Sequence, residues 1–251
     1  MYKWDWGILL RHEPGGTGRY LRYLFVGLGW TLATAIVAWV IALTIGSLVG
    51  TLRTTTNPWV VRAGNAYVEV FRNIPLIVQM FLWFFVVPEF LPKALGDWIK
   101  QIPPPWGSYL PAVMCLAIFT SVRVAEQVRA GINSLPRGQR MAGTAMGLTQ
   151  SQTYRYVILP QAFRIILPPL TSEFMNIVKN SSVALTIGLL ELTGRARAMQ
   201  EFSFRVFEAF AAATVIYILT NLVVVLAMRY LENRVRVPGL IAAGGAPQAG
   251  H

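Results

Sequence analysis

The sequence predicts an all-α fold, a polytopic membrane helical bundle of about five transmembrane helices with a cytoplasmic loop. Only 13% of the 251 residues are charged, about half the share in an ordinary globular chain, and the mean hydropathy is +0.50. Several long runs of the chain carry no charge at all. Because a helix needs about 20 apolar residues to cross a bilayer, these runs indicate that lipid is the main solvent of the fold.

Five helices are predicted, three from runs without charge and two from apolar runs that Glu69 and Arg72, or Glu173 and Lys179, interrupt. They are expected between Arg22 and Arg53, from Tyr67 to Pro88, from Gln101 to Val122, from Ile165 to Leu190 and from Ala209 to Met228. The first run is too long for the apolar core of a secretory signal, so we expect its helix to remain in the mature protein. The domain boundaries that follow are an extracytoplasmic segment 1–22, a transmembrane domain 23–237 with a loop at about 131–160, and a flexible tail 238–251.

Turn signals and charges orient these helices. The stretch RTTTNP from Arg53 ends the first helix, and the proline-rich stretch 88–105 is predicted as an exterior loop with Trp98 and Trp106 at the membrane interface. Segments 53–72 and 123–164 and the tail carry a modest excess of Lys and Arg over the remaining loops. Positive loops face the cytoplasm, so the N-terminus is expected outside and the C-terminus inside. The net charge of +11 is then a topology signal, and no nucleic-acid partner is expected.

The side chains that most enzymes and metal sites use are scarce. The single cysteine, Cys115, lies in an apolar run and is interpreted as a packing residue, and His12 and His251 lie near the termini. No G-x-x-x-x-G-K-[ST] sequence occurs, so the chain has no phosphate-binding loop for ATP. We therefore expect no metal, no cofactor and no enzyme activity in this chain.

The stretch MAGTAMGLTQSQTYRYVILP from Met141 to Pro160 is too short and too polar to cross a bilayer. It predicts a short helix that exposes the small residues Ala142, Gly143 and Ala145, followed by a left-handed turn at Gly147. Thr149 and Gln152 then form a capping-box pattern, and the second helix is expected to stop near Leu159 because Pro160 disfavours a helix before it. Such a glycine elbow is either a solvated connector or a docking element for a partner.

This stretch resembles the signature of the permease subunits of bacterial ATP-binding-cassette importers, EAA, three residues, G, nine residues, I, one residue, LP. Two flanking stretches, EQVRAGINSLPRGQR from Glu126 and FRNIPLIVQ from Phe71, resemble the polar amino acid permeases, most of all the glutamate/aspartate branch. Met141 and Gly143 depart from the signature, where the family has Glu and Ala. The resemblance covers about three quarters of the chain.

The resemblance implies that the elbow is a coupling helix that inserts into an ATPase subunit. The residues assigned to this contact are Ala142, Gly143, Ala145, Gly147, Leu148, Leu159 and Pro160. It also implies two ATPase subunits that use the ATP, a second permease that is a paralogue or a second copy, and a periplasmic solute-binding protein. The protein would be a multi-pass protein of the bacterial inner membrane, in contact with lipid, that imports glutamate or aspartate.

Charged residues at membrane depth usually face a bundle interior or a wet cavity. Helical spacing places Glu173, Asn176 and Asn180 on one face, with Lys179 about 60° away. One interpretation is a substrate pathway in which Lys179 contacts the substrate carboxylate. The alternative is that Glu173 and Lys179 pair with other helices or with a partner subunit.

Two other classes of protein remain as alternatives to the importer. A stand-alone secondary transporter or channel is disfavoured because we find no internal repeat. A membrane enzyme is disfavoured because no nucleophile and base are placed together. Gly46 and Gly50 in the first helix form a GxxxG pair, which we interpret as a helix-packing device.

Overall fold

The computed structural model describes residues 2–15 and 18–235, and this part of the chain is helical apart from its connections. The predicted tail 238–251 lies outside the described residues. The α-helices are α1 (Tyr20–Leu52), α2 (Pro58–Arg72), α3 (Leu76–Phe81), α4 (Val87–Phe90), α5 (Lys93–Lys100), α6 (Trp106–Asn133), α7 (Arg137–Ala145), α8 (Gln150–Thr153), α9 (Leu159–Asn180), α10 (Leu192–Ser203) and α11 (Val206–Val235). The 3-10 helices are η1 (Trp6–Leu10) and η4 (Ser181–Ile187), and the π-helical turns are η2 (Leu82–Val86) and η3 (Tyr154–Ile158).

Three of these helices, α1, α6 and α11, are long and apolar enough to cross a membrane. They confirm three of the predicted runs. A fourth span is obtained only if α2 and the helical run 76–90 are counted as one, although the two are bent by 100°. Helix α9 fills most of the predicted run 165–190 but is not among the helices that meet this criterion. By length and composition three helices are candidate spans, or four with the bent pair, and α9, which runs from the elbow end towards α10, is the remaining one of the five predicted.

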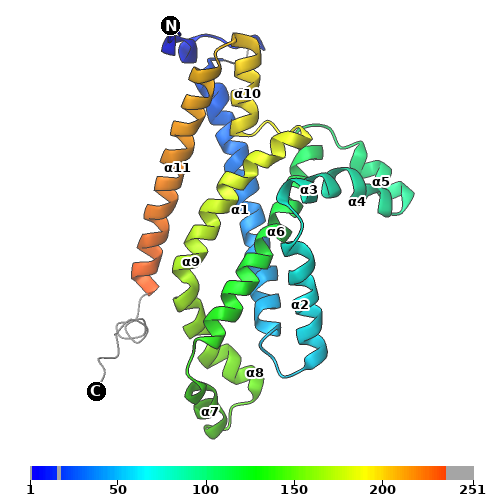
Figure 1. Ribbon diagram of the computed structural model, residues 1–251, viewed down its shortest axis with the longest axis vertical. Helices are drawn as coiled ribbons and strands as arrows, with labels where there is room; N and C mark the ends of the chain where they lie inside the picture. Colours follow the sequence, from blue (N-terminus) through cyan, green and yellow to red (C-terminus); the bar gives the residue numbers. More distant parts are fainter. Residues whose placement is uncertain (1, 16–17, 236–251) are drawn as a thin grey trace.

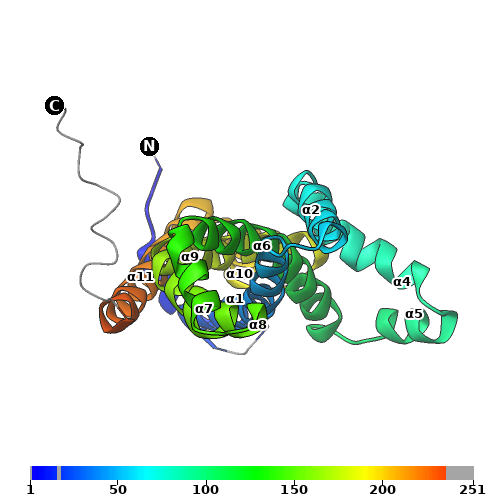
Figure 2. The same ribbon diagram turned by 90° about the horizontal axis from the view of Figure 1, so that it is seen from below.

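The span predicted from Tyr67 to Pro88 is not one continuous helix, because the chain turns sharply between α2 and α3. Pro75 has no amide hydrogen and disfavours a helix at the residue before it. The side-chain amide of Gln79 compensates for the break, since it donates to the carbonyls of Phe71 (2.9 Å) and Ile74 (3.1 Å). Figure 2 shows that the α4 and α5 region extends sideways, away from the rest of the bundle.

The centre of the bundle is a tight contact between α1 and α6. A Cβ atom at Gly46 would lie 2.6 Å from the Ser121 carbonyl oxygen, and one at Gly50 would lie 2.6 Å from that of Ala125. Only glycine allows two backbones to approach this closely. The interpretation of this pair as a packing device is confirmed. Cys115 is fully buried in the adjoining apolar core, as its packing interpretation requires.

The helix expected to end near Leu159 does not end there. Helical hydrogen bonding continues from α8 through η3 into α9, so that Pro160 occupies the first turn of α9. The π-helical turn explains how the proline is accommodated, because the Leu159 amide donates to the Tyr154 carbonyl, one residue further back than in an α-helix. Because Pro160 has no amide hydrogen, it donates no hydrogen bond within this continuous helix, and the wider turn lies directly before it.

The two ends of the molecule carry different elements. In Figure 1, α7 and α8 project beyond the ends of α6 and α9 at the bottom of the view. The N-terminal segment, α10 and the start of α11 gather at the opposite end. Helices α1, α6 and α9 connect the two ends and hold them apart.

Candidate functional site

The predicted elbow is present in the form the sequence indicates. Gly147 follows α7 with a φ of +76°, a conformation that glycine adopts at little cost. The capping box is also formed, since the Gln152 amide donates to the Thr149 hydroxyl oxygen (3.3 Å) and the Thr149 amide donates to the Gln152 side-chain oxygen (2.9 Å). Two independent local signals therefore fix the direction change between α7 and α8.

One side of the elbow is open to solvent. Ala142, Ala145 and Gly147 are exposed, and Met141 and Met146 are each 68% exposed. A Cβ atom at Gly147 would meet no other atom within 4 Å. Methionine adapts its shape to a partner more readily than other apolar side chains do. This surface of small and flexible residues suits contact with another protein.

The remaining predicted coupling residues are distributed differently. The expectation that Gly143 is exposed is wrong, because it is buried against Thr153, whose Cγ2 atom would lie 2.7 Å from an added Cβ atom. Gly143 thus lets α7 pack closely on α8. Leu148 and Leu159 are partly buried and Pro160 is exposed. Only part of the predicted set shares the open surface.

A hydrogen bond connects the elbow to the distant α1–α2 turn. The Tyr154 side chain is 8% exposed, and its hydroxyl donates to the Thr54 carbonyl at 2.8 Å. The guanidinium of Arg140 lies 5.6 Å from the centre of the same ring. Because Tyr154 begins the π-helical turn that leads into α9, it joins α7, α9 and the end of α1 at one point.

An ion pair with one buried partner adjoins this connection. Arg53, whose side chain is 3% exposed, contacts Glu126 of α6 at 3.0 Å and donates to the Asn65 side-chain oxygen of α2 at 2.8 Å. Gly64 makes room for it, since a Cβ atom there would lie 2.6 Å from the Arg53 Cγ atom. Glu126 thus connects α6 to the end of α1. The elbow rests on a polar junction of α1, α2 and α6.

The four predicted pathway residues of α9 do not share one environment. Glu173 faces α6, where its carboxylate lies 3.7 Å from Arg123 and accepts from the Gln127 side chain at 3.3 Å. Lys179 is exposed and forms no ion pair within the described residues, while Asn176 and Asn180 are partly buried. Glu173 thus fits the interhelical alternative, and Lys179 is left available to a ligand or a partner.

Sequence reasoning missed the most completely buried acidic group near α9. Glu191 is fully buried, caps α10 by accepting from the amides of Thr193 (2.9 Å) and Gly194 (2.8 Å), and accepts from the hydroxyl of Tyr217 (2.9 Å). The Thr31 hydroxyl lies 3.3 Å from the same carboxylate. A lone acid directly after an apolar run was the available signal, because carboxylates are favoured at helix starts.

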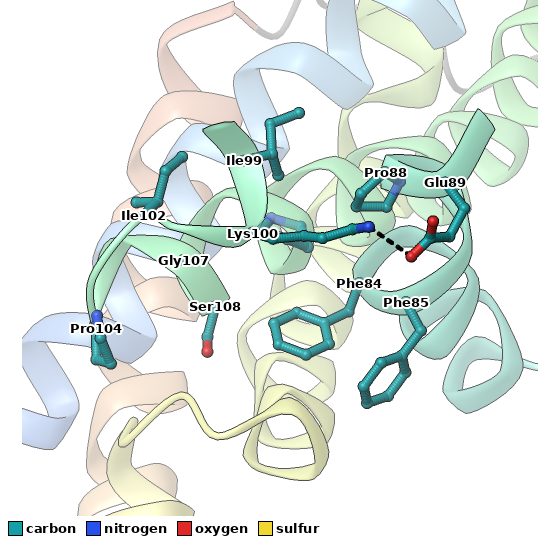
Figure 3. A pocket seen from close by; sticks show the side chains of 11 residues that line it. Phe84, Phe85, Pro88, Glu89, Ile99, Lys100, Ile102, Pro104, Gly107 and Ser108 are labelled. Atoms are coloured by element: carbon teal, nitrogen blue, oxygen red, sulfur yellow. Dashed lines mark ion pairs between the residues drawn. The ribbon is translucent and has the colours of Figure 1, made fainter. Parts of the chain in front are cut away.

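A pocket of about 410 Å³ lies between the lateral α4–α5 region and the start of α6. Figure 3 shows the rings of Phe84 and Phe85 on one side and the ion pair of Lys100 with Glu89 beside them, with 2.6 Å between the charged atoms. The Ser108 hydroxyl at its wall already donates to the Ile187 carbonyl. None of the predicted coupling or pathway residues lines this pocket, and its lining offers no nucleophile with a base.

Comparisons with known proteins agree on one family. Residues 42–237 match the family described as "Binding-protein-dependent transport system inner membrane component". The chain is 48% identical to the glutamate/aspartate import permease protein GltJ of Escherichia coli (strain K12), over 94% of this chain and 96% of that protein. It is 30% identical to the glutamate/aspartate import permease protein GltK of E. coli O6:H1, over 93% and 99% of the two chains.

A solved structure shares the fold. The crystal structure of an amino acid ABC transporter with histidines matches with a TM-score of 0.72 and 31% identity, over 86% of this chain and 95% of that chain. Both the sequence matches and this structural match extend across nearly the full length of the proteins concerned. The similarity therefore includes the elbow, α9 and the helices around them.

Proposed function

This chain belongs to the family of binding-protein-dependent transport system inner membrane components, and from that premise we propose that it is the permease of an ATP-driven importer of glutamate and aspartate. The 48% identity to a glutamate/aspartate import permease supports the choice of substrate. ATP is hydrolysed on a separate subunit of such a system, in agreement with the lack of a phosphate-binding loop in this sequence.

The observation that carries the proposal is the exposed elbow at Gly147. It projects from the bundle, is fixed internally by its capping box, and presents Ala142 and Ala145 without bulk. We propose that an ATPase subunit binds this surface and that closure of the ATPase subunits moves α7. The polar junction at Tyr154 and Arg53 would pass the movement to α9, α1 and α6.

The placement of the elbow determines the proposed topology and partners. ATPase subunits are cytoplasmic, so α7 and α8 lie inside, the N-terminus and α10 lie outside, and the C-terminus lies inside. A solute-binding protein delivers substrate at the outer end. A second permease of the same family completes the pathway, which Asn176, Lys179 and Asn180 of α9 line in this proposal.

Co-purification with a matched pair of variants tests the coupling surface. Gly147→Asp places a charge and a strained φ at the elbow, whereas Gly138→Asp adds the same charge to the start of α7, where a Cβ atom also meets nothing within 4 Å. We expect an ATPase subunit to accompany the wild type and Gly138→Asp from native membranes and to be depleted from Gly147→Asp. An equal yield from both variants would contradict docking at the elbow. If no ATPase appears with the wild type, a stand-alone transporter becomes the better assignment.

Uptake in reconstituted vesicles tests the substrate and Lys179 together. A hydrogen bond to a charged group contributes roughly 1.5–3 kcal/mol, so Lys179→Met should lower glutamate and aspartate uptake about tenfold or more. Lys93→Met, at an exposed lysine of α5, is the control and should transport normally. Undiminished uptake by an assembled Lys179→Met complex would reject the carboxylate contact, and preferential uptake of glutamine by the wild type would reject the acidic substrate.

A further inference from the structure

Aromatic side chains gather on the surface at the outer end of the molecule. They come from the N-terminal segment and from the turn between α10 and α11, and each is between 40% and 84% exposed. The members of this set, here called the aromatic collar, are Tyr2, Trp4, Trp6, Phe202, Phe204 and Phe207.

The collar is firmly attached to α11 through one carboxylate. Glu208, fully buried in the first turn of α11, accepts from the Asp5 amide at 2.7 Å and from the Tyr2 hydroxyl. Arg205 donates to the Lys3 carbonyl at 2.7 Å. Three contacts thus hold residues 2–5 against the start of α11.

The 3-10 helix η1 has one face that packs on the bundle and one face that is exposed. Ile8 is 6% exposed and packs in an apolar cluster with Leu24 of α1 and Met199 of α10. Trp6 and Leu10 are 50% and 57% exposed. The segment therefore uses one apolar side chain to bind the bundle and presents the others outward, which is costly if they face only water.

The exposed rings contact one another rather than lying singly. The rings of Trp4 and Trp6 are stacked with centroids 5.6 Å apart, and Tyr2 meets Phe207 edge to face at 4.8 Å. Trp4 lies 5.8 Å from Phe207 as well. A preassembled aromatic surface of this kind has few rotamers left to lose when it binds a partner.

The collar is continuous with the apolar surface of a spanning helix. Below Phe207, α11 exposes Val215, Ile218, Leu222 and Leu226 at helical spacing along one side, each more than half exposed. In a helix that crosses a membrane, such a side faces acyl chains. The collar lies where this surface reaches its outer end.

We propose that the aromatic collar is a lipid-binding surface. It lies in the membrane–water interface on the outer face of the membrane that α11 crosses, and it fixes the depth of the outer end of α11. Tryptophan and tyrosine are enriched at this level of a bilayer because each has an apolar ring and a polar group. Lys3, exposed in the same segment, complements phospholipid phosphates, whereas Arg11, also exposed, is paired with Asp5 at 2.8 Å. This goes beyond transport, because it needs only that α11 crosses the membrane.

Spin-label depth measurements test the proposal in phospholipid nanodiscs. The single cysteine is buried, so Cys115→Ala provides a background for labels at Trp6→Cys and at Leu10→Cys. Gly138→Cys is the aqueous control, since it lies on α7, which projects beyond the bundle, and its Cβ atom would meet nothing within 4 Å, and Leu222→Cys on α11 is the acyl-chain control. Collision with oxygen is compared with collision with a water-soluble nickel chelate.

The ratio of oxygen collisions to nickel collisions should be several-fold higher for the labels at 6 and 10 than for the label at 138, and lower than for the label at 222. Two labels guard against a local disturbance at Trp6. Nickel access at 6 and 10 equal to that at 138 would overturn the proposal. Labels open to nickel that become shielded only when the solute-binding protein is added would also overturn it, and would assign the collar to protein docking. Neither outcome depends on ATPase binding or uptake.

Discussion

Two of the side-chain caps at helix starts in the described residues, those of α8 and α10, are built in opposite ways. Thr149 starts α8 at the exposed elbow and bonds only to Gln152, three residues away. Glu191 starts α10 in a fully buried position and bonds to Tyr217, 26 residues away, beside Thr31 at a separation of 160 residues. The first cap shapes a surface, whereas the second joins α1, α10 and α11. Removing the buried cap should therefore affect the whole fold, and altering the elbow should affect one local function.

The largest expected effect is at the buried cap. Glu191→Leu leaves two amides and the Tyr217 hydroxyl without their acceptor, and each buried unpaired donor costs about 1–3 kcal/mol. The free energy of unfolding should fall by roughly 3 kcal/mol or more, which lowers the apparent Tm by roughly 10 °C. Thermal unfolding of the purified protein measures this loss.

The control for this variant is Glu201→Gln. Glu201 pairs with Arg197 on the surface of the same helix, with both side chains more than half exposed, so its loss should change stability by less than about 1 kcal/mol. Equal unfolding temperatures for Glu191→Leu and Glu201→Gln would show that the buried cap does not join the three helices.

The same contrast explains what could be predicted from the sequence. The elbow was predictable because its signals, Gly147 and the pair Thr149 with Gln152, act within a few residues. The Glu191 site was not, because its partners are distant in sequence and only folding brings them together. The 100° bend within the predicted span from Tyr67 to Pro88 could not be read from hydropathy, for another reason. Hydropathy measures how apolar a segment is and carries no information on the direction of the chain. The break before Pro75, where Gln79 donates to the free carbonyls of Phe71 and Ile74, leaves the number of apolar residues in the segment unchanged.

Gly143 gives an intermediate effect inside the elbow. Gly143→Val would press a branched side chain on Thr153, and overpacking of this kind costs about 1–3 kcal/mol. We expect amide hydrogen exchange in α7 and α8 to accelerate roughly tenfold or more, while the apparent Tm changes little. Ala142→Val, on the exposed side of the same helix, should exchange as the wild type does. A drop in Tm as large as that of Glu191→Leu would mean that the elbow is part of the global core.

The smallest change in stability, and the most informative one for transport, is expected at Tyr154. Tyr154→Phe removes the hydroxyl that donates to the Thr54 carbonyl, a loss of about 1 kcal/mol that leaves the exposed docking surface intact. ATPase binding and ATP hydrolysis should persist in the reconstituted complex. Substrate imported per ATP should fall several-fold, because α7 and α9 are no longer tied to the α1–α2 turn.

Tyr156→Phe is the matched control for this variant. Tyr156 is 63% exposed, and no side-chain hydrogen bond involves it within the described residues, so the ratio of uptake to hydrolysis should stay at the wild-type value. Thr54→Val keeps the carbonyl acceptor and removes only the hydroxyl at 3.2 Å, so it should have a smaller effect than Tyr154→Phe. If Tyr154→Phe retains full coupling, the elbow moves α9 only through the continuous helix from α8 to α9. The elbow would then act through local contacts alone, in full contrast to the buried Glu191 cap, which joins three helices.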